Sequence, residues 1–296
     1  MIIVKLKGGL GNQMFQYAVA RGISNTEKEV LLDTSFFSYN KKSTGILTAR
    51  KYELSIFPNL KASETNSLYS YALGNGGLQR RVLRKMLFPS INYIIQKENE
   101  LINFNNTPKN RVLLLDGFFQ SEKYFKHIRK ELINEFSFEY EKGENDKYID
   151  LINSRTNSVS VHVRRGDYIK PAVNIYHGVL PLSYYDIAIR KIELEVEEPH
   201  YFIFSDDIEW CKIHFRKDQS KITFVERISM DDSWKDLYLM TLCRHHIVAN
   251  SSYSWWGAWL SDKRGFKYAP SKWFNPDVAT FDIHDFVPES WEIIYY

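Results

Sequence analysis

Short apolar segments typical of buried β-strands alternate along this sequence with segments typical of helices. The predicted strands are 2–6, 29–33, 111–116, 158–164, 200–204, 221–225 and 247–249. The predicted helices are 14–24, 79–88, 122–135, 182–196 and 233–243, with another opened by 250–259. This alternation favours an α/β fold with parallel sheets. At 296 residues the chain is long enough for two domains, which we place at 1–150 and 151–296, with the charged stretch 139–150 leading from one to the other.

Composition excludes several classes of protein. Hydrophobic residues make up 44% and charged residues 25%, as in soluble globular proteins. The net charge of +3 gives no reason to expect a nucleic acid partner. Cys211 and Cys243 predict buried thiols and no disulfide framework. There is no apolar run of the roughly 20 residues that cross a bilayer and no apolar signal-peptide region, so we expect a cytoplasmic protein.

The strand over 158–164 presents the most informative polar residues. Its valines alternate with polar residues that include His162 and Arg164, and it opens into a loop at Gly166. Ligands collect at the carboxyl ends of strands in open α/β sheets, where the adjacent Arg164 and Arg165 would suit a phosphate or pyrophosphate. The alternative is an arginine pair solvated on a loop. The sequence from Arg165 to Asp167 also matches an adhesion tripeptide, which is too short to distinguish from chance.

Two further predicted strands end in polar groups. Ser205, Asp206 and Asp207 follow one strand, and a run from Asn250 to Ser252 follows another. Serines at a helix start cap the helix and also donate to phosphate, so together with the arginines they would form a clamp that needs no metal. The two aspartates could instead bind a divalent cation, or serve as turn and cap residues.

A glycine loop follows the first strand. Gly8, Gly9 and Gly11 precede the helix over 14–24, an arrangement that aims backbone N–H groups at an anion. Asp33 stands about where a dinucleotide fold places its ribose-binding acid, but Met14 stands where that fingerprint needs a small residue. A nicotinamide-dependent oxidoreductase is therefore an alternative that the loop does not favour.

The predicted helix over 79–88 is basic and amphipathic. Its residues are Arg80, Arg81, Arg84 and Lys85 among Val82, Leu83, Met86, Leu87 and Phe88. Such a helix suits peripheral contact with an anionic membrane surface, here the inner face of the membrane. The alternative is a solvated helix packed on the body of the protein.

Four stretches of the chain resemble the α-1,2-fucosyltransferases, the inverting, GDP-fucose-dependent enzymes of glycosyltransferase family 11. They are Gly8–Ala18, His162–Tyr168, Phe204–Asp207 and Asn250–Trp259, in the order found in the family. The resemblance implies a GT-B-type fold, with two Rossmann-like domains and the donor site in the cleft between them. It assigns GDP-fucose to the carboxyl-terminal domain and the acceptor to the amino-terminal domain, on which the last helix would pack back.

The resemblance also implies an activity. The expected reaction moves L-fucose from GDP-β-L-fucose to the 2-hydroxyl of a terminal β-galactose of a glycan, with inversion and without metal or other cofactor. The product would belong to a surface polysaccharide or a lipid-linked oligosaccharide. The alternative is a nucleotide-sugar binding protein without catalysis.

Residue roles carried over from the family centre on the arginine strand. Arg164 is implied as the β-phosphate ligand, and we group it with Asp167 as catalytic. Asp236 matches in spacing an acid that reads guanine, the alternative being an acid favoured at a helix start. The other residues expected to bind the donor are Gly11, Asn12, His162, Arg165, Ser205, Asp206, Asp207, Asn250, Ser251 and Ser252.

The general base is left open by the sequence. Related enzymes carry a glutamate a few residues past the arginine motif, but Ile169 to Ala172 follow it here. The remaining candidates at strand ends or loops are Asp33, Asp116, Glu122 and Asp167.

Overall fold

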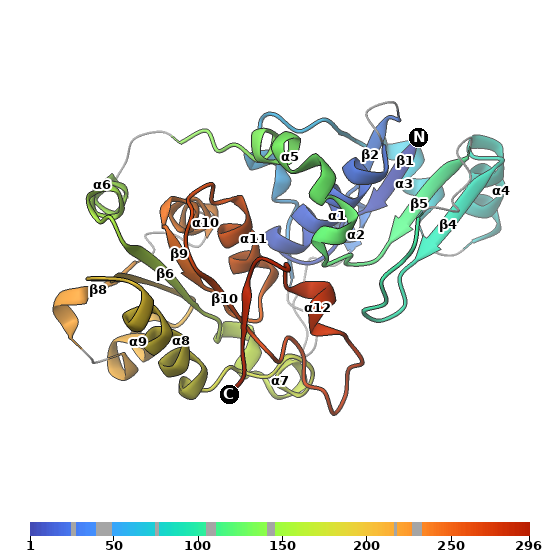
Figure 1. The fold of residues 1–296 in the computed structure, drawn as a ribbon. Coiled ribbons are helices and arrows are strands. Elements are labelled where there is room, and N and C mark those ends of the chain that lie inside the picture. Colours follow the sequence, from blue (N-terminus) through green and yellow to red (C-terminus); the bar gives the residue numbers. More distant parts are fainter. Residues whose placement is uncertain are drawn as a thin grey trace. The chain divides into compact units, whose positions relative to one another are not determined.

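A computed structural model describes residues 1–24, 28–39, 49–74, 77–104, 111–140, 146–215, 218–226 and 233–296 (Figure 1). Within it the chain forms two compact units, Met1–Glu139 and Tyr140–Tyr296. Each unit has one parallel sheet flanked by helices. The predicted α/β class and the two Rossmann-like domains are therefore confirmed.

The first unit is built on a five-stranded sheet in the order β3-β2-β1-β5-β4. Its strands are β1 Ile2–Lys5, β2 Val30–Asp33, β3 Ser63–Glu64, β4 Ile91–Ile95 and β5 Val112–Asp116. Its helices are α1 Leu10–Ser24, α2 Ser35–Tyr39, α3 Ser67–Leu73, α4 Leu78–Leu87 and α5 Arg129–Glu135, with a 3₁₀ turn at Leu54–Ile56. Since β1 pairs with β2 on one side and β5 on the other, the strand order reverses direction between β1 and β5.

Helix α1 is buried on almost every side, which explains its many apolar positions. Two buried polar groups in its carboxyl-terminal half, those of Tyr17 and Arg21, share one carboxylate of α5. Arg21 pairs with Glu135 at 2.6 Å, and the Tyr17 hydroxyl donates to Glu135 at 2.5 Å. A buried charge needs such partners, so this cluster fixes α5 against α1.

The helix predicted over 122–135 is correct only in its second half. Two 3₁₀ turns, Glu122–Tyr124 and Lys126–Ile128, precede α5. The reason is a close approach to α1, because a Cβ on Gly22 would lie 2.3 Å from the Tyr124 carbonyl oxygen. The segment is shaped by that contact rather than by its own helical propensity.

The second unit is built on a six-stranded sheet in the order β11-β10-β9-β6-β7-β8. Its strands are β6 Ser158–Val163, β7 His200–Ser205, β8 Ile222–Phe224, β9 His245–Ile247, β10 Lys267–Pro270 and β11 Glu292–Ile294. Its helices are α6 Asp146–Ser154, α7 Pro171–His177, α8 Leu182–Glu195, α9 Ile208–His214, α10 Ser233–Leu242, α11 Ser252–Leu260 and α12 Ile283–Phe286. The strand order reverses between β6 and β9, and crevices at such switch points are where open α/β sheets bind ligands.

Both faces of this sheet are covered, so β6 and β7 are buried along their whole length. Val161 and Ile203 pack with Tyr184 of α8 on one face, whereas Phe202 packs with Ile152 of α6 on the other. The alternation in β6 therefore separates two buried faces, one apolar and one polar, rather than a buried face from a solvated one.

Two other sequence-based boundaries differ from the structure. Strand β9 begins at His245 rather than 247, because His246 is buried and its Nδ1 lies 2.9 Å from the Ser160 hydroxyl of β6. Helix α6 packs with the second sheet, so the second unit includes residues that the sequence had placed in the first domain. Two predictions from composition can also be compared with the structure. Both cysteines are buried free thiols, as predicted. In the described part of the chain, every helix is too short or too polar to cross a membrane.

Candidate functional site

The loop after β6 holds Arg164 between two carboxylates. Its Nη1 lies 2.6 Å from Asp206 and its Nη2 lies 2.5 Å from Asp167. Burial alone would lower the pKa of Arg164, but the attraction of the two aspartates outweighs it and raises the pKa. Arg164 is therefore a permanent cation in a fixed orientation.

Asp206 also binds the backbone of the same loop. Its Oδ1 accepts hydrogen bonds from the N–H groups of Arg165 and Gly166, each at 2.9 Å. A Cβ on residue 166 would stand 2.4 Å from Asp206 Oδ2, so glycine is required here by the close approach of the carboxylate. The Arg165–Asp167 tripeptide is thus engaged in contacts within the protein.

Arg165 has a separate set of partners on α9. Its Nε donates to Asp207 at 3.0 Å, and its guanidinium lies 4.0 Å from the centroid of the Trp210 ring. Asp207 also caps α9 by accepting from the Trp210 N–H. The Ser205 hydroxyl donates to the Val163 carbonyl and accepts from the Asp207 N–H, so it holds the ends of β6 and β7 together.

The two guanidiniums are outnumbered by three carboxylates in this cluster. The cluster around Arg164 and Arg165, which were predicted to attract pyrophosphate, therefore has no excess of positive charge. A guanidinium has five N–H donors, and the ion pairs of Arg164 engage one on each of Nη1 and Nη2, so it retains donors for a further ligand. Its side chain is 22% exposed, which leaves it reachable from solvent.

Asn250 connects the loop after β6 to the loop after β9. The Tyr168 hydroxyl donates to the Asn250 carbonyl at 3.1 Å, and Asn250 Nδ2 donates to the carbonyls of His177 and Gly178. The His177 ring stacks on Tyr168, and burial lowers its pKa to about 4, with Asp167 and Arg164 acting in opposite directions. Asn250 is 2% exposed, so its side chain positions these loops from within.

The serines predicted to bind phosphate stand at the start of α11. Ser251 is the N-cap, with its hydroxyl oxygen 3.4 Å from the Tyr253 N–H, and Ser252 is the first helical residue. Both therefore lie at the carboxyl-terminal edge of the sheet, where the chain passes from β9 into α11, across the switch point from Arg164.

His162 and Asp236 lie on elements adjoining α11. The buried His162 ring on β6 is 5.7 Å from the ring of Tyr253, whose hydroxyl donates to the Ser233 carbonyl at the start of α10. Asp236 is in the first turn of α10 and is 4% exposed. The second unit thus gathers every predicted donor-binding residue except Gly11 and Asn12.

Gly11 and Asn12 belong to the first unit and lie in the first turn of α1, because this helix begins at Leu10 rather than at the predicted residue 14. The glycine loop before it, at Gly8 and Gly9, is held by amide side chains. Gln13 Nε2 donates to the Gly8 carbonyl, and Gln16 Nε2 reaches the Gly117 carbonyl in the loop after β5. Asn12 Oδ1 accepts from Gln120 Nε2 at 2.7 Å. These bonds join the loops after β1 and β5, which flank the switch point of the first sheet.

The sequence model of glycosyl transferase family 11 matches residues 83–294 of the chain. The chain belongs to glycosyltransferase family 11. Its sequence-based assignment to the family, and to the glycosyltransferases as enzymes, is confirmed.

Three relatives illustrate the range of this glycosyltransferase's family. The chain is 32% identical to an α-1,2-colitosyltransferase of Escherichia coli over 98% of both chains. It is 34% identical to the O-antigen biosynthesis glycosyltransferase WbnK of Escherichia coli, over 94% of this chain and 97% of the relative. It is 31% identical to human galactoside α-(1,2)-fucosyltransferase 1, over 50% of this chain and 43% of the human protein.

Among solved structures, the glycosyltransferase is similar to Arabidopsis thaliana FUT1 in complex with GDP, with a TM-score of 0.49 and 11% identity over 94% of this chain and 72% of that one. It is also similar to the fucosyltransferase NodZ from Bradyrhizobium, with a TM-score of 0.46 and 10% identity over 86% of this chain and 91% of that one.

Three of the acids considered as the general base of the glycosyltransferase are constrained. Burial would raise the pKa of Asp116, but Lys7 at 3.0 Å and Lys5 at 3.4 Å lower it. Asp33 is 1% exposed, and its Oδ1 accepts from the Ser35 N–H. Asp167 is paired with Arg164. A base needs a carboxylate that is free to accept a proton, whereas Asp116 and Asp167 are ion-paired and Asp33 is buried.

Glu53 of the first unit is a further candidate for the base. Burial raises its pKa, against the opposing attraction of Arg50 and Lys51. Its carboxylate accepts a hydrogen bond from the N–H of Leu10, the first residue of α1, and its own N–H donates to Gln13 at 2.9 Å. Sequence reasoning missed Glu53, because no motif surrounds it and only the fold brings it to the glycine loop.

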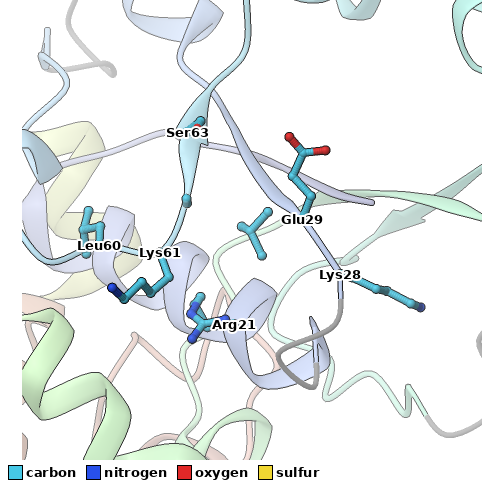
Figure 2. A pocket seen from close by; sticks show the side chains of 8 residues that line it. Arg21, Lys28, Glu29, Leu60, Lys61 and Ser63 are labelled. Atoms are coloured by element: carbon cyan, nitrogen blue, oxygen red, sulfur yellow. The ribbon is translucent and has the colours of Figure 1, made fainter.

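A pocket of about 560 Å³ lies elsewhere in the first unit (Figure 2). It is bordered by Arg21 of α1, by Glu29 just before β2 and by Ser63 of β3. These positions are at the amino-terminal ends of β2 and β3, away from the glycine loop. The pocket includes none of the predicted site residues, and Arg21 there is already paired with Glu135.

Across the described residues, His, Cys, Asp and Glu side chains form no group of three or more suited to a metal ion. Asp206 and Asp207, considered as cation ligands, each contact an arginine instead.

Proposed function

We propose that this family 11 enzyme is a galactoside α-1,2-fucosyltransferase that uses GDP-fucose. The observation that carries the proposal is the arrangement around Arg164, a fixed cation at the carboxyl end of the central strand β6, with Ser251 and Ser252 in the loop across the switch point. Relatives named as α-1,2-fucosyl and α-1,2-colitosyl transferases support the linkage.

In this proposal the second unit binds GDP. Arg164 and the start of α11 meet the diphosphate, His162 contacts the nucleoside and Asp236 reads guanine. As the bond from fucose C1 to the phosphate oxygen breaks, charge grows on GDP, and Arg164 stabilises it. The ion pairs with Asp206 and Asp167 keep the guanidinium oriented before the donor arrives.

The first unit supplies the acceptor side and the base. The galactose 2-hydroxyl attacks C1 from the face opposite GDP, which inverts the configuration, and its proton passes to a carboxylate. Glu53 is the carboxylate we assign, because its raised pKa brings proton affinity closer to neutral pH.

The reaction as proposed needs no metal. Positive charge and hydroxyl donors come from Arg164, Ser251 and Ser252, while Asp206 and Asp207 are engaged with arginines. The enzyme would work in the cytoplasm on a surface polysaccharide or lipid-linked oligosaccharide.

A second donor is favoured by the relative that matches 98% of the chain, a colitosyltransferase. Colitose is fucose without its 3-hydroxyl group. A site that hydrogen-bonds that hydroxyl would reject the deoxy sugar by about 10⁴-fold, whereas an apolar site would accept both sugars within about 100-fold. The ratio of kcat/KM for the two GDP sugars therefore decides between the donors.

The direct test is transfer of labelled fucose from GDP-fucose to a panel of β-galactosides, with the new linkage determined by NMR. An α-1,2-fucosyl product is expected. Tight binding of GDP-fucose without turnover on any galactoside would instead indicate a nucleotide-sugar binding protein, and turnover with GDP-colitose alone would replace the donor.

A further inference from the structure

Exposed apolar side chains concentrate on one part of the first unit. Among the described residues, eight of the 17 large apolar side chains that are exposed lie between residues 68 and 101. They come from α3, α4, β4 and the segment after β4: Leu68, Tyr71, Leu78, Val82, Met86, Tyr93, Ile95 and Leu101. Apolar surface gathered in this way marks an interaction site rather than the scattered exposure of a typical surface.

Helix α4 carries three of these side chains in a single stripe, including the two most exposed of the eight. Leu78, Val82 and Met86 are four residues apart and are 78%, 51% and 74% exposed. Arg81 and Lys85 are exposed and follow Leu78 and Val82 by three residues, so they border the stripe. We call these five residues the α4 surface. The helix contains no acidic residue and no buried one.

The other two basic residues of α4 serve a different purpose. The Arg80 guanidinium lies 4.6 Å from the centroid of the Tyr71 ring of α3. Arg84 Nη1 donates to the Tyr93 hydroxyl of β4 at 2.9 Å. These arginines attach α4 to its neighbours, and their attachment turns the α4 surface outward.

We propose that the α4 surface binds reversibly to an anionic lipid bilayer, with the helix lying along the membrane. A bilayer interface offers an apolar layer and a negative headgroup layer together, which matches an apolar stripe bordered by cations. A bilayer also requires no shape complementarity from the protein. The inference goes beyond the proposed function and does not depend on which sugar is transferred.

The experiment is co-sedimentation of the full chain with phosphatidylcholine vesicles and with vesicles of equal parts phosphatidylcholine and phosphatidylglycerol. Binding is expected only to the anionic vesicles and should weaken as salt increases. The double variant Arg81→Gln, Lys85→Gln should bind about 30-fold more weakly, since each basic residue near the surface contributes about fivefold. The triple variant Leu78→Ser, Val82→Ser, Met86→Ser should lose detectable binding.

The matched control is Lys126→Gln, Lys130→Gln, which removes two exposed positive charges elsewhere on the first unit. It should bind like the parent, and melting temperatures should agree across all four proteins because every altered side chain is exposed. Equal weakening in the control would mean that net charge, not the α4 surface, drives binding. Absence of binding to anionic vesicles would also refute the proposal. In that case, a dimer of the parent that the triple variant converts to a monomer would show that the α4 surface joins two copies of the chain. A monomeric parent would leave an acidic protein as the partner.

Discussion

The two sheets of this enzyme present different chemistry at the same topological position. At the switch point of the second sheet, the loop after β6 is held by ion pairs among Arg164, Arg165 and three aspartates. At the switch point of the first sheet, the loop after β1 is held by the amides of Gln13 and Gln16. One edge therefore gathers two arginines among three aspartates. The other combines amide hydrogen bonds with Asp116, which is paired with Lys5 and Lys7, and with Glu53, the one of these two carboxylates whose pKa is raised.

The difference indicates a division of labour. A departing diphosphate needs preorganised charge, and ion pairs orient guanidiniums at no cost when the reaction begins. A sugar hydroxyl needs directional hydrogen bonds and a base of suitable pKa, which a charged cluster would depress.

Arg164→Lys should reduce kcat/KM several hundred-fold, equivalent to about 3–4 kcal/mol. Lysine keeps the charge but lacks the planar guanidinium, which can bind Asp167, Asp206 and a phosphate at the same time. Much of the loss should be in kcat, because the charge grows as GDP departs. Steady-state kinetics measures both terms, with the exposed Arg190→Lys as a control. A change within about threefold would make Arg164 peripheral.

Glu53→Gln should lower kcat by about 100-fold or more, with little change in the KM for GDP-fucose. In the parent, activity should fall as the pH drops through the raised pKa of Glu53, because the protonated acid cannot accept a proton. The variant should lose that acidic limb of the pH profile. Its melting temperature at neutral pH should be equal or higher, because folding no longer requires a buried charge. An unchanged pH profile would place the base elsewhere.

Asp236→Asn should weaken GDP binding about 10- to 100-fold. The amide replaces one acceptor by a donor and leaves one of the two donors on guanine unmet, at about 1–3 kcal/mol. Binding of ADP should remain equally poor in both proteins, and the melting temperature should hold. Calorimetry with the two nucleotides measures this. Normal GDP binding with early melting would make Asp236 a structural acid of the first turn of α10.

Gly166→Ala and Gly9→Ala compare the space available for a side chain in the loop after β6 and in the loop after β1. The new Cβ would stand 2.4 Å from Asp206 in the first case and 3.7 Å from Arg50 in the second. We expect Gly166→Ala to lower the free energy of unfolding by about 1–2 kcal/mol and to reduce activity, and Gly9→Ala to be nearly neutral. Urea denaturation provides the comparison. Equal tolerance would show that the Asp206 contact yields easily.

Removal of divalent cations should have the smallest effect. Turnover in EDTA should equal turnover in buffer, since Asp206 and Asp207 are occupied by arginines. If EDTA abolished activity and manganese restored it, these two aspartates would be metal ligands. The contrast between the carboxyl-terminal edges of the two sheets would then no longer hold.

Sequence reasoning recovered the parts of the fold and site that local pattern controls. The apolar alternation of β6 and the polar groups after β6, β7 and β9 were visible because each is a short, contiguous run. It did not reveal that the arginines pair with Asp206 and Asp207, because that depends on the pairing of β6 with β7. Glu53 was invisible for the same reason, since its partners Leu10 and Gln13 are about 40 residues away in the chain. The 3₁₀ turns before α5 result from a contact with Gly22 that no local rule contains.

The strand order also has a consequence for folding during synthesis. The central strand β6 pairs with β9, in which His245 lies opposite Val159, so one side of β6 stays open until the last quarter of the chain has been made. The first sheet closes earlier, because β1 needs only β5, which ends at Asp116. Long-range parallel pairing is slow, and an open strand edge invites aggregation. A nascent chain stalled before residue 245 should therefore have a folded first unit and an incompletely folded second unit. The second unit should be prone to aggregation and should bind chaperones.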